Sequence, residues 1–129
     1  MRLGICLIVF LTCSVVHAGD NWPDYRGPHA NGHSDAKDVP LKWSESQSVK
    51  WKVAVPGKGW SSPIILGDQV WMTTSTDEGK KLRAICFDRD SGKLLHNTVV
   101  FSRDTAESVH KLNSHASPSP VIEDGRVYV

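Results

Sequence analysis

The stretch Ser-Pro-Ile-Ile-Leu-Gly-Asp-Gln-Val-Trp-Met at residues 62–72 recurs without a gap as Ser-Pro-Val-Ile-Glu-Asp-Gly-Arg-Val-Tyr-Val at residues 119–129. In each copy a Ser-Pro pair begins a β-branched run, a Gly-Asp or Asp-Gly step turns the chain, and a Val-aromatic-aliphatic run returns. Two-residue turns of this kind need a positive φ at a central residue, which Gly or Asp supplies, and they suit the twist of paired strands. Each copy therefore predicts a β-hairpin.

The two Ser-Pro pairs, Ser62-Pro63 and Ser119-Pro120, mark the start of a repeated unit. A hairpin that recurs at an interval of tens of residues indicates a repeat architecture, in which each unit buries its apolar face only against its neighbours. Because the second copy reaches Val129, the last residue, we expect the chain to be the N-terminal part of a longer protein.

Residues 1–18 have the pattern of a signal peptide. Arg2 supplies a positive start, residues 3–16 are mostly apolar, and Val-His-Ala at residues 16–18 has the small-x-small form of a cleavage site. We therefore expect export to the periplasm or beyond, with a mature chain that begins at Gly19. The apolar run is shorter than the ~20 residues that span a membrane, so no transmembrane segment is expected. Nor is a lipid anchor, because Thr12 stands before Cys13 where lipoprotein signals have Gly, Ala or Ser.

The charge of the mature chain is balanced. Removal of residues 1–18 leaves 14 basic and 14 acidic residues, which argues against a nucleic-acid partner because no basic field remains. Cys86 is then the last of the three cysteines, so no internal disulfide can form. Apolar neighbours on both sides predict that Cys86 is a small buried side chain rather than a reactive thiol.

The rest of the chain predicts strands and turns, an all-β fold. Residues 19–48 are rich in Asp, Asn, Gly, Pro and His and are expected to form an extended lead-in. Residues 49–55 alternate apolar and polar, which is typical of a half-buried strand. Residues 62–101 then hold four expected strands, and a polar connection over residues 102–117 leads to the second hairpin. Four antiparallel strands in each unit are typical of a β-propeller blade.

One segment resembles a known family. Cys-Phe-Asp-Arg-Asp-Ser-Gly-Lys-Leu-Leu-His at residues 86–96 is similar to the repeat of pyrroloquinoline-quinone (PQQ)-type propellers, which reads roughly Ala-x-Asp-x-x-Thr-Gly-Lys-x-x-Trp. Asp88, Gly92 and Lys93 match this repeat, whereas Cys86 and His96 depart from it. His96 stands where the family has the tryptophan that docks one blade on the next.

The lead-in adds to this resemblance. Trp-Pro-Asp-Tyr-Arg-Gly-Pro at residues 22–28 resembles the start of a bacterial exported subgroup known as PQQ-binding-like β-propeller repeat proteins. The resemblance implies a propeller over residues 49–129. Its first blade would span about residues 62–101 and its second would begin near residue 119, while the strand at residues 49–55 would complete the last blade and close the ring.

The family pattern also has an explanation that needs no cofactor. Asp88 at the start of a turn can accept hydrogen bonds from N–H groups two or three residues on, Gly92 suits a left-handed position, and Lys93 begins the next strand on its solvated side. We therefore interpret the repeat-signature residues as structural and assign no catalytic, cofactor-binding or metal role; they are Ser62, Pro63, Asp88, Gly92, Lys93, His96, Ser119 and Pro120.

The remaining histidines and tryptophans suggest no metal centre. His29 and His33 would share a face only on a helix, which the surrounding Gly-Pro and Asn-Gly pairs disfavour. His110 and His115 fall in the polar connection, where solvated loop histidines are usual. Trp60 differs from the other tryptophans, because it lies in a loop that enters the first hairpin, at a propeller face where ligands usually sit.

These features favour an exported, non-catalytic β-propeller that serves as a binding or scaffold module for a protein or polymeric ligand. The alternative is the N-terminal part of a PQQ-dependent dehydrogenase. In that case PQQ and calcium would bind the full-length protein, although none of the residues that hold them in the family can be placed here, and we expect none bound by this chain alone. A structural or sensory module fused to other domains is a third hypothesis.

Overall fold

The computed structural model of the chain describes residues 21–37 and 39–129. The expected signal peptide at residues 1–18 and the expected mature start at Gly19 lie outside the described residues.

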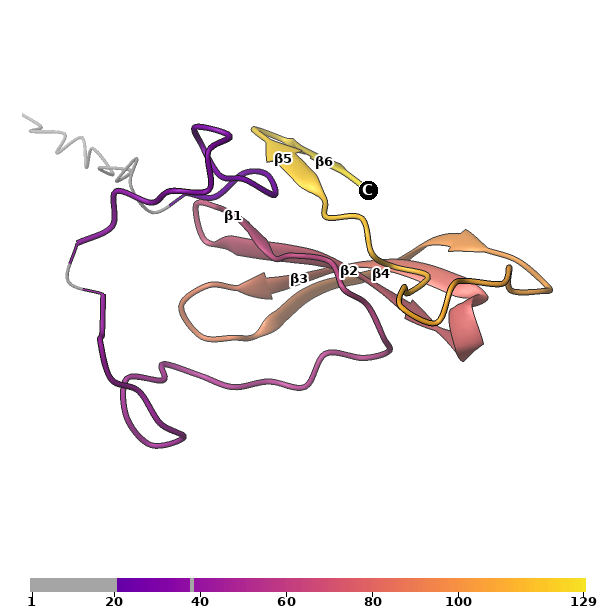
Figure 1. The fold of residues 1–129 in the computed structure, drawn as a ribbon, viewed down its shortest axis with the longest axis horizontal. Helices are drawn as coiled ribbons and strands as arrows, with labels where there is room; N and C mark the ends of the chain where they lie inside the picture. Colours follow the sequence, from indigo (N-terminus) through magenta and orange to yellow (C-terminus); the bar gives the residue numbers. More distant parts are fainter. Residues whose placement is uncertain (1–20, 38) are drawn as a thin grey trace, which may run out of the picture.

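Four antiparallel strands follow one another in chain order across one sheet (Figure 1). Their bounds are β1 (Ile64–Leu66), β2 (Gln69–Thr76), β3 (Lys81–Asp88) and β4 (Leu94–Ser102). A single 3₁₀ turn, η2 (Asp77–Gly79), connects β2 to β3. The predictions of an all-β chain and of four antiparallel strands within residues 62–101 are therefore confirmed.

A second, two-stranded sheet contains β5 (Val121–Glu123) and β6 (Arg126–Tyr128). Both hairpins that the repeated sequence predicts are present, and each has a two-residue turn. The positive φ falls on glycine in both copies, at 59° in Gly67 and 74° in Gly125. Because Gly has no Cβ, it adopts this conformation without steric strain.

The core lies along the middle of the four-stranded sheet. The centre of β3 supplies four consecutive buried residues, and Ile64 of β1 and Ile85 of β3 are fully buried. Strand β4 differs, because all nine of its residues are exposed and it pairs with β3 alone among the described strands. The sheet is therefore covered over β1 to β3 and open along β4.

The first part of the lead-in folds onto the two hairpins. Its first described residues lie between the two hairpins (Figure 1): Trp22 exchanges two backbone hydrogen bonds with Ile65 of β1, and the Pro23 carbonyl accepts from the N–H of Ile122 in β5. Residues 24–32 then form successive turns. The Trp22 ring lies so close to Gly27 that a Cβ there would be 2.7 Å away from it. These contacts fold the lead-in back onto the hairpins.

Residues 49–55, expected to form a strand that completes another blade, are paired with no strand of the described chain. The three valines of this segment are 38% to 44% exposed. A strand needs a neighbour to receive its backbone hydrogen bonds. The segment is instead held by contacts near its two ends: the Trp51 indole donates to the Arg89 carbonyl at 2.8 Å, and the Pro56 carbonyl accepts from the Thr74 hydroxyl at 2.8 Å.

The two faces of the sheet carry different segments. Successive side chains of a strand point to opposite faces, so Thr73 and Thr74 of β2 mark the two sides. Thr74 bonds Pro56, whereas the Thr73 hydroxyl donates to the Pro118 carbonyl at 2.8 Å. The segment around Pro56 therefore lies on one face, and the connection that leads into the second hairpin lies on the other.

Candidate functional site

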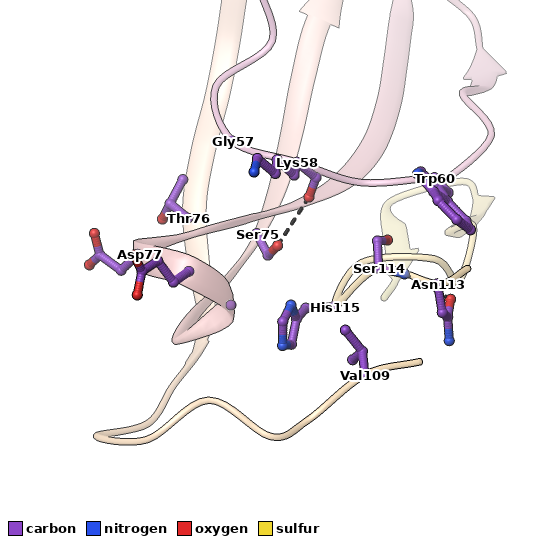
Figure 2. A pocket seen from close by; sticks show the side chains of 12 residues that line it. Gly57, Lys58, Trp60, Ser75, Thr76, Asp77, Val109, Asn113, Ser114 and His115 are labelled. Atoms are coloured by element: carbon purple, nitrogen blue, oxygen red, sulfur yellow. Dashed lines mark hydrogen bonds between the residues drawn. The ribbon is translucent and has the colours of Figure 1, made fainter. Parts of the chain in front are cut away.

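A pocket of about 630 Å³ lies at the end of the sheet where β2 stops and β3 begins. Three separate parts of the chain form its wall, within residues 57–60, 75–79 and 109–115 (Figure 2). Its volume falls within the ~300–1,000 Å³ typical of small-ligand sites. The pocket combines an exposed tryptophan, Trp60, with several polar groups.

Backbone pairing holds residues 57–60, the first of the three wall segments, in place. Lys58 exchanges two backbone hydrogen bonds with Ser75, at 2.9 and 2.8 Å, and the Ser75 hydroxyl also donates to the Lys58 carbonyl (Figure 2). The Trp60 N–H donates to the Ala116 carbonyl at 3.0 Å. Residues 58–60 therefore bridge the end of β2 and the connection that precedes β5.

Trp60 is exposed although its backbone is fixed. Its side chain is 59% exposed, and its indole N–H has no hydrogen bond to any described residue. Figure 2 shows the ring on the same side of the pocket as Asn113. Burial of a tryptophan is normally favourable, so a fixed and exposed indole is a suitable surface for a ligand. The sequence-based expectation placed Trp60 in a loop before the first hairpin, and the structure has it there.

The second wall segment, residues 75–79, contains three consecutive residues with left-handed backbone. The φ angles are 51° at Asp77, 55° at Glu78 and 95° at Gly79. This conformation is unfavourable for residues with a Cβ, by roughly 1–2 kcal/mol each, and such strain concentrates at functional sites. A salt bridge from Asp77 to Lys81 at 2.7 Å helps to hold the turn, and the Lys81 ammonium lowers the pKa of the Asp77 carboxyl.

His115 lies against this turn, between Ser75 and Val109 (Figure 2). The sequence suggested a solvated loop histidine, but the residue is half-buried and its ring packs on Gly79. A Cβ at position 79 would lie 2.5 Å from three ring atoms, so Gly79 is required for this approach. The Nε2 atom lies 2.8 Å from the Glu107 carbonyl. In a neutral ring Nε2 is then the donor and Nδ1 is left as an acceptor.

Asn113 presents a donor to the same pocket. Its Oδ1 accepts from the Ser114 N–H at 2.9 Å and from the Ser117 hydroxyl at 2.5 Å. These two bonds orient the amide, and its NH₂ group donates to no residue that the structure describes. The pocket therefore offers an aromatic ring, hydrogen-bond donors and at least one acceptor.

The repeat-signature turn lies at the opposite end of the sheet from the pocket. Asp88 Oδ1 accepts from the Ser91 N–H at 2.7 Å and from its hydroxyl at 2.5 Å, and these bonds lower the pKa of Asp88. Gly92 has a φ of 70°, and its N–H donates to the Asp88 carbonyl at 2.8 Å. Lys93 is exposed and precedes β4. The Trp51 ring covers Gly92, where a Cβ would lie 2.7 Å from it.

The two Ser-Pro pairs meet in space. The Ser62 N–H donates to the Ser119 hydroxyl at 2.8 Å, across 57 residues of sequence. Pro120 is fully buried and Pro63 is exposed. The first strands of the two hairpins, β1 and β5, therefore lie beside each other.

His96 is part of a third cluster, on the face of the sheet that also carries Trp71 and Cys86. Register places Trp71, Cys86 and His96 directly opposite one another on β2, β3 and β4. The Trp71 and His96 rings stack with centroids 5.4 Å apart and planes within 8°. The prediction that Cys86 is buried is confirmed, and burial raises the pKa of its thiol to about 11.

The remaining histidines are dispersed. His29 lies 3.4 Å from Asp35 in the lead-in, and His110 accepts the Leu112 N–H at its ring nitrogen. Within residues 21–37 and 39–129, no three His, Cys, Asp or Glu side chains are placed to hold a metal ion. In the same part of the chain, no helix is long and apolar enough to cross a membrane.

Comparison of the chain with protein-family models, curated proteins and solved structures found no match. Sequence reasoning singled out Trp60 but missed the residues that line the pocket with it, at 77–79 and 113–115. A signal was present in Asp-Glu-Gly at residues 77–79, because this composition is typical of tight turns.

Proposed function

We propose that this chain belongs to an exported, non-catalytic β-propeller that acts as a binding or scaffold module for a protein or polymeric ligand. The observation that carries the proposal is the pocket beside Trp60, because it lies at the end of the sheet. Units stacked on the two faces of a blade leave its ends uncovered, and propeller ligands approach there.

The arrangement of the segments around the sheet supports the propeller. The two hairpins meet at their first strands through the Ser62 and Ser119 contact, as expected if equivalent strands of neighbouring units adjoin. Residues 49–56 lie on the other face. In a closed ring that face would be covered by the last blade, to which this segment would contribute its missing strand.

The chemistry of the pocket favours binding over quinone catalysis. Two carboxylates, those of Asp77 and Glu78, stand at its wall and disfavour an anionic ligand such as PQQ, which carries three carboxyl groups. Trp60 and the polar groups that line the pocket with it instead suit a ligand with both apolar and hydrogen-bonding surfaces.

The test compares three forms of the protein that differ at one tryptophan. The wild type, Trp60→Ala and Trp43→Ala are immobilised and exposed to fractionated cell-envelope protein and polysaccharide. Trp43 is the matched control because it is 71% exposed and lies outside the Trp60 pocket. We expect material retained by the wild type to be retained equally by Trp43→Ala and about 2- to 12-fold less by Trp60→Ala, since aromatic contacts contribute ~0.5–1.5 kcal/mol.

Two results would contradict the proposal. Equal retention by all three forms would show that the pocket is not the binding site. Stoichiometric uptake of PQQ with calcium-dependent oxidation of an alcohol would support the dehydrogenase alternative instead.

A further inference from the structure

We infer that the Trp60 pocket binds a neutral sugar ring of a polysaccharide. This inference rests on the proposed binding function and deepens it, because it names the chemical class of the ligand.

The first argument is the mixed character of the pocket wall. A pyranose has a face of C–H groups and a rim of hydroxyl groups. The exposed indole of Trp60 suits the C–H face, because an aromatic face packs against apolar hydrogens. The polar groups of Asn113, on the same side of the pocket as the ring, and of His115 suit the hydroxyl rim. A peptide would satisfy fewer of these groups, since its backbone donors and acceptors are spaced along an extended line.

The second argument is the distribution of donors and acceptors. The Asn113 NH₂ group and the Trp60 indole N–H are donors with no partner among the described residues, and His115 Nδ1 is an acceptor when the ring is neutral. Each sugar hydroxyl both donates and accepts, so one ring can satisfy groups of both kinds. A ligand that only accepts would leave His115 Nδ1 unpaired.

The third argument is charge. Lys58 contributes one positive charge to the pocket wall, whereas Asp77 and Glu78 contribute two negative charges, one of them paired with Lys81. The balance gives no net attraction for an anion. A neutral hexose polymer is therefore favoured over a polymer of uronic acids or one that carries phosphate.

The fourth argument is the rigidity of the wall. The left-handed turn at residues 77–79, the packing of His115 on Gly79 and the pairing of Lys58 with Ser75 all hold the pocket before a ligand arrives. A preorganised wall lowers the entropy that binding costs. It suits a weakly binding sugar, whose affinity depends on many small contacts.

The experiment is a calorimetric titration of the protein with four oligosaccharides: cellohexaose, maltohexaose, chitohexaose and the anionic hexagalacturonate. We expect at least one neutral hexasaccharide to bind, and Trp60→Ala to weaken its binding about 2- to 12-fold. Trp60→Phe should retain part of the affinity because it keeps an aromatic face. His115→Ala should weaken binding as well, while Trp43→Ala leaves it unchanged. Circular dichroism on each variant shows that the fold is kept.

The outcomes separate the two proposals. Absence of binding by every neutral sugar at about 10 mM, with Trp60-dependent retention of a cell-envelope protein, would overturn the sugar assignment and leave the binding function standing. Tighter binding of hexagalacturonate than of the neutral sugars would overturn the charge argument. Sugar binding that Trp60→Ala leaves unchanged would overturn this site for both proposals.

Discussion

Replacement of Gly92 by alanine tests how residues 49–55 are attached to the sheet. Gly92 has a φ of 70°, and a Cβ there would lie 2.7 Å from the Trp51 ring. The left-handed backbone costs alanine roughly 1–2 kcal/mol. The Trp51 ring must also move, which breaks its 2.8 Å hydrogen bond to the Arg89 carbonyl, a bond that contributes about 0.5–1.5 kcal/mol. With some lost ring burial, we expect Gly92→Ala to lower the free energy of unfolding by about 2–4 kcal/mol.

Gly32 provides the matched control. Its φ of 77° is close to that of Gly92, but no atom lies within 4 Å of the position where its Cβ would be. Gly32→Ala should therefore lower the free energy of unfolding only by the cost of a left-handed backbone in alanine, roughly 1–2 kcal/mol. The difference between the two variants measures the attachment of Trp51.

The assay is urea denaturation of the wild type, the two glycine variants, Trp51→Ala and the double variant Trp51→Ala/Gly92→Ala, followed by circular dichroism. In the Trp51→Ala background, the cost of Gly92→Ala should fall to that of Gly32→Ala, because no ring remains to be displaced. Equal costs for Gly92→Ala and Gly32→Ala in the wild-type background would refute the reasoning. Residues 49–55 would then not be docked on the turn through Trp51.

Four further predictions concern other parts of the chain. The Cys86 thiol should resist Ellman's reagent at pH 8 until denaturant is added, because it is buried and its pKa is raised to about 11; rapid labelling of the folded protein would contradict this. Hydrogen bonds from Ser91 lower the pKa of Asp88, so the Asp88 carboxylate should stabilise the fold at pH values above its ordinary pKa of 3.8. This stabilisation should be lost as the pH falls from 3.8 through the lower pKa of the folded state. Asp88→Asn should accordingly be less stable than wild type at pH 7 and approach it at low pH, and parallel stability curves would disprove the assignment. N-terminal sequencing of exported material should begin at Gly19, and any other start would show that the cleavage site is wrong. Residues 19–129 alone should self-associate in analytical ultracentrifugation, because β4 is exposed along its whole length; a reversible monomeric melting transition would argue against this.

The local elements were predictable because their signals are short in range. The turns at Gly67 and Gly125 follow from two adjacent residues, and the Asp88 turn follows from six. Residues 49–55 are the opposite case, because their state depends on long-range contacts. Their alternation describes a segment with one buried face, but whether it becomes a strand depends on a partner that supplies hydrogen bonds. No described strand does so, and the segment is attached through the contacts of Trp51 and Pro56 instead.

The pocket residues likewise divide into one that the local sequence singles out and others that only long-range contacts bring to it. Trp60 could be singled out from its place before the first hairpin, but nothing local connects it with Asn113 or His115, which lie more than fifty residues away. Their proximity results from the pairing of Lys58 with Ser75 and of Trp60 with Ala116, both of which are long-range contacts.

The sequence by itself determined the all-β class, the two hairpins and the left-handed glycines, because period-two patterns and turn residues act on the backbone within a few positions. Only the tertiary structure decided that Ser62 meets Ser119, that the lead-in lies between the hairpins and that the Trp71 and His96 rings stack. Each of these is a contact between residues far apart in the chain. Such contacts depend on how the elements pack together, which no local stretch of sequence specifies.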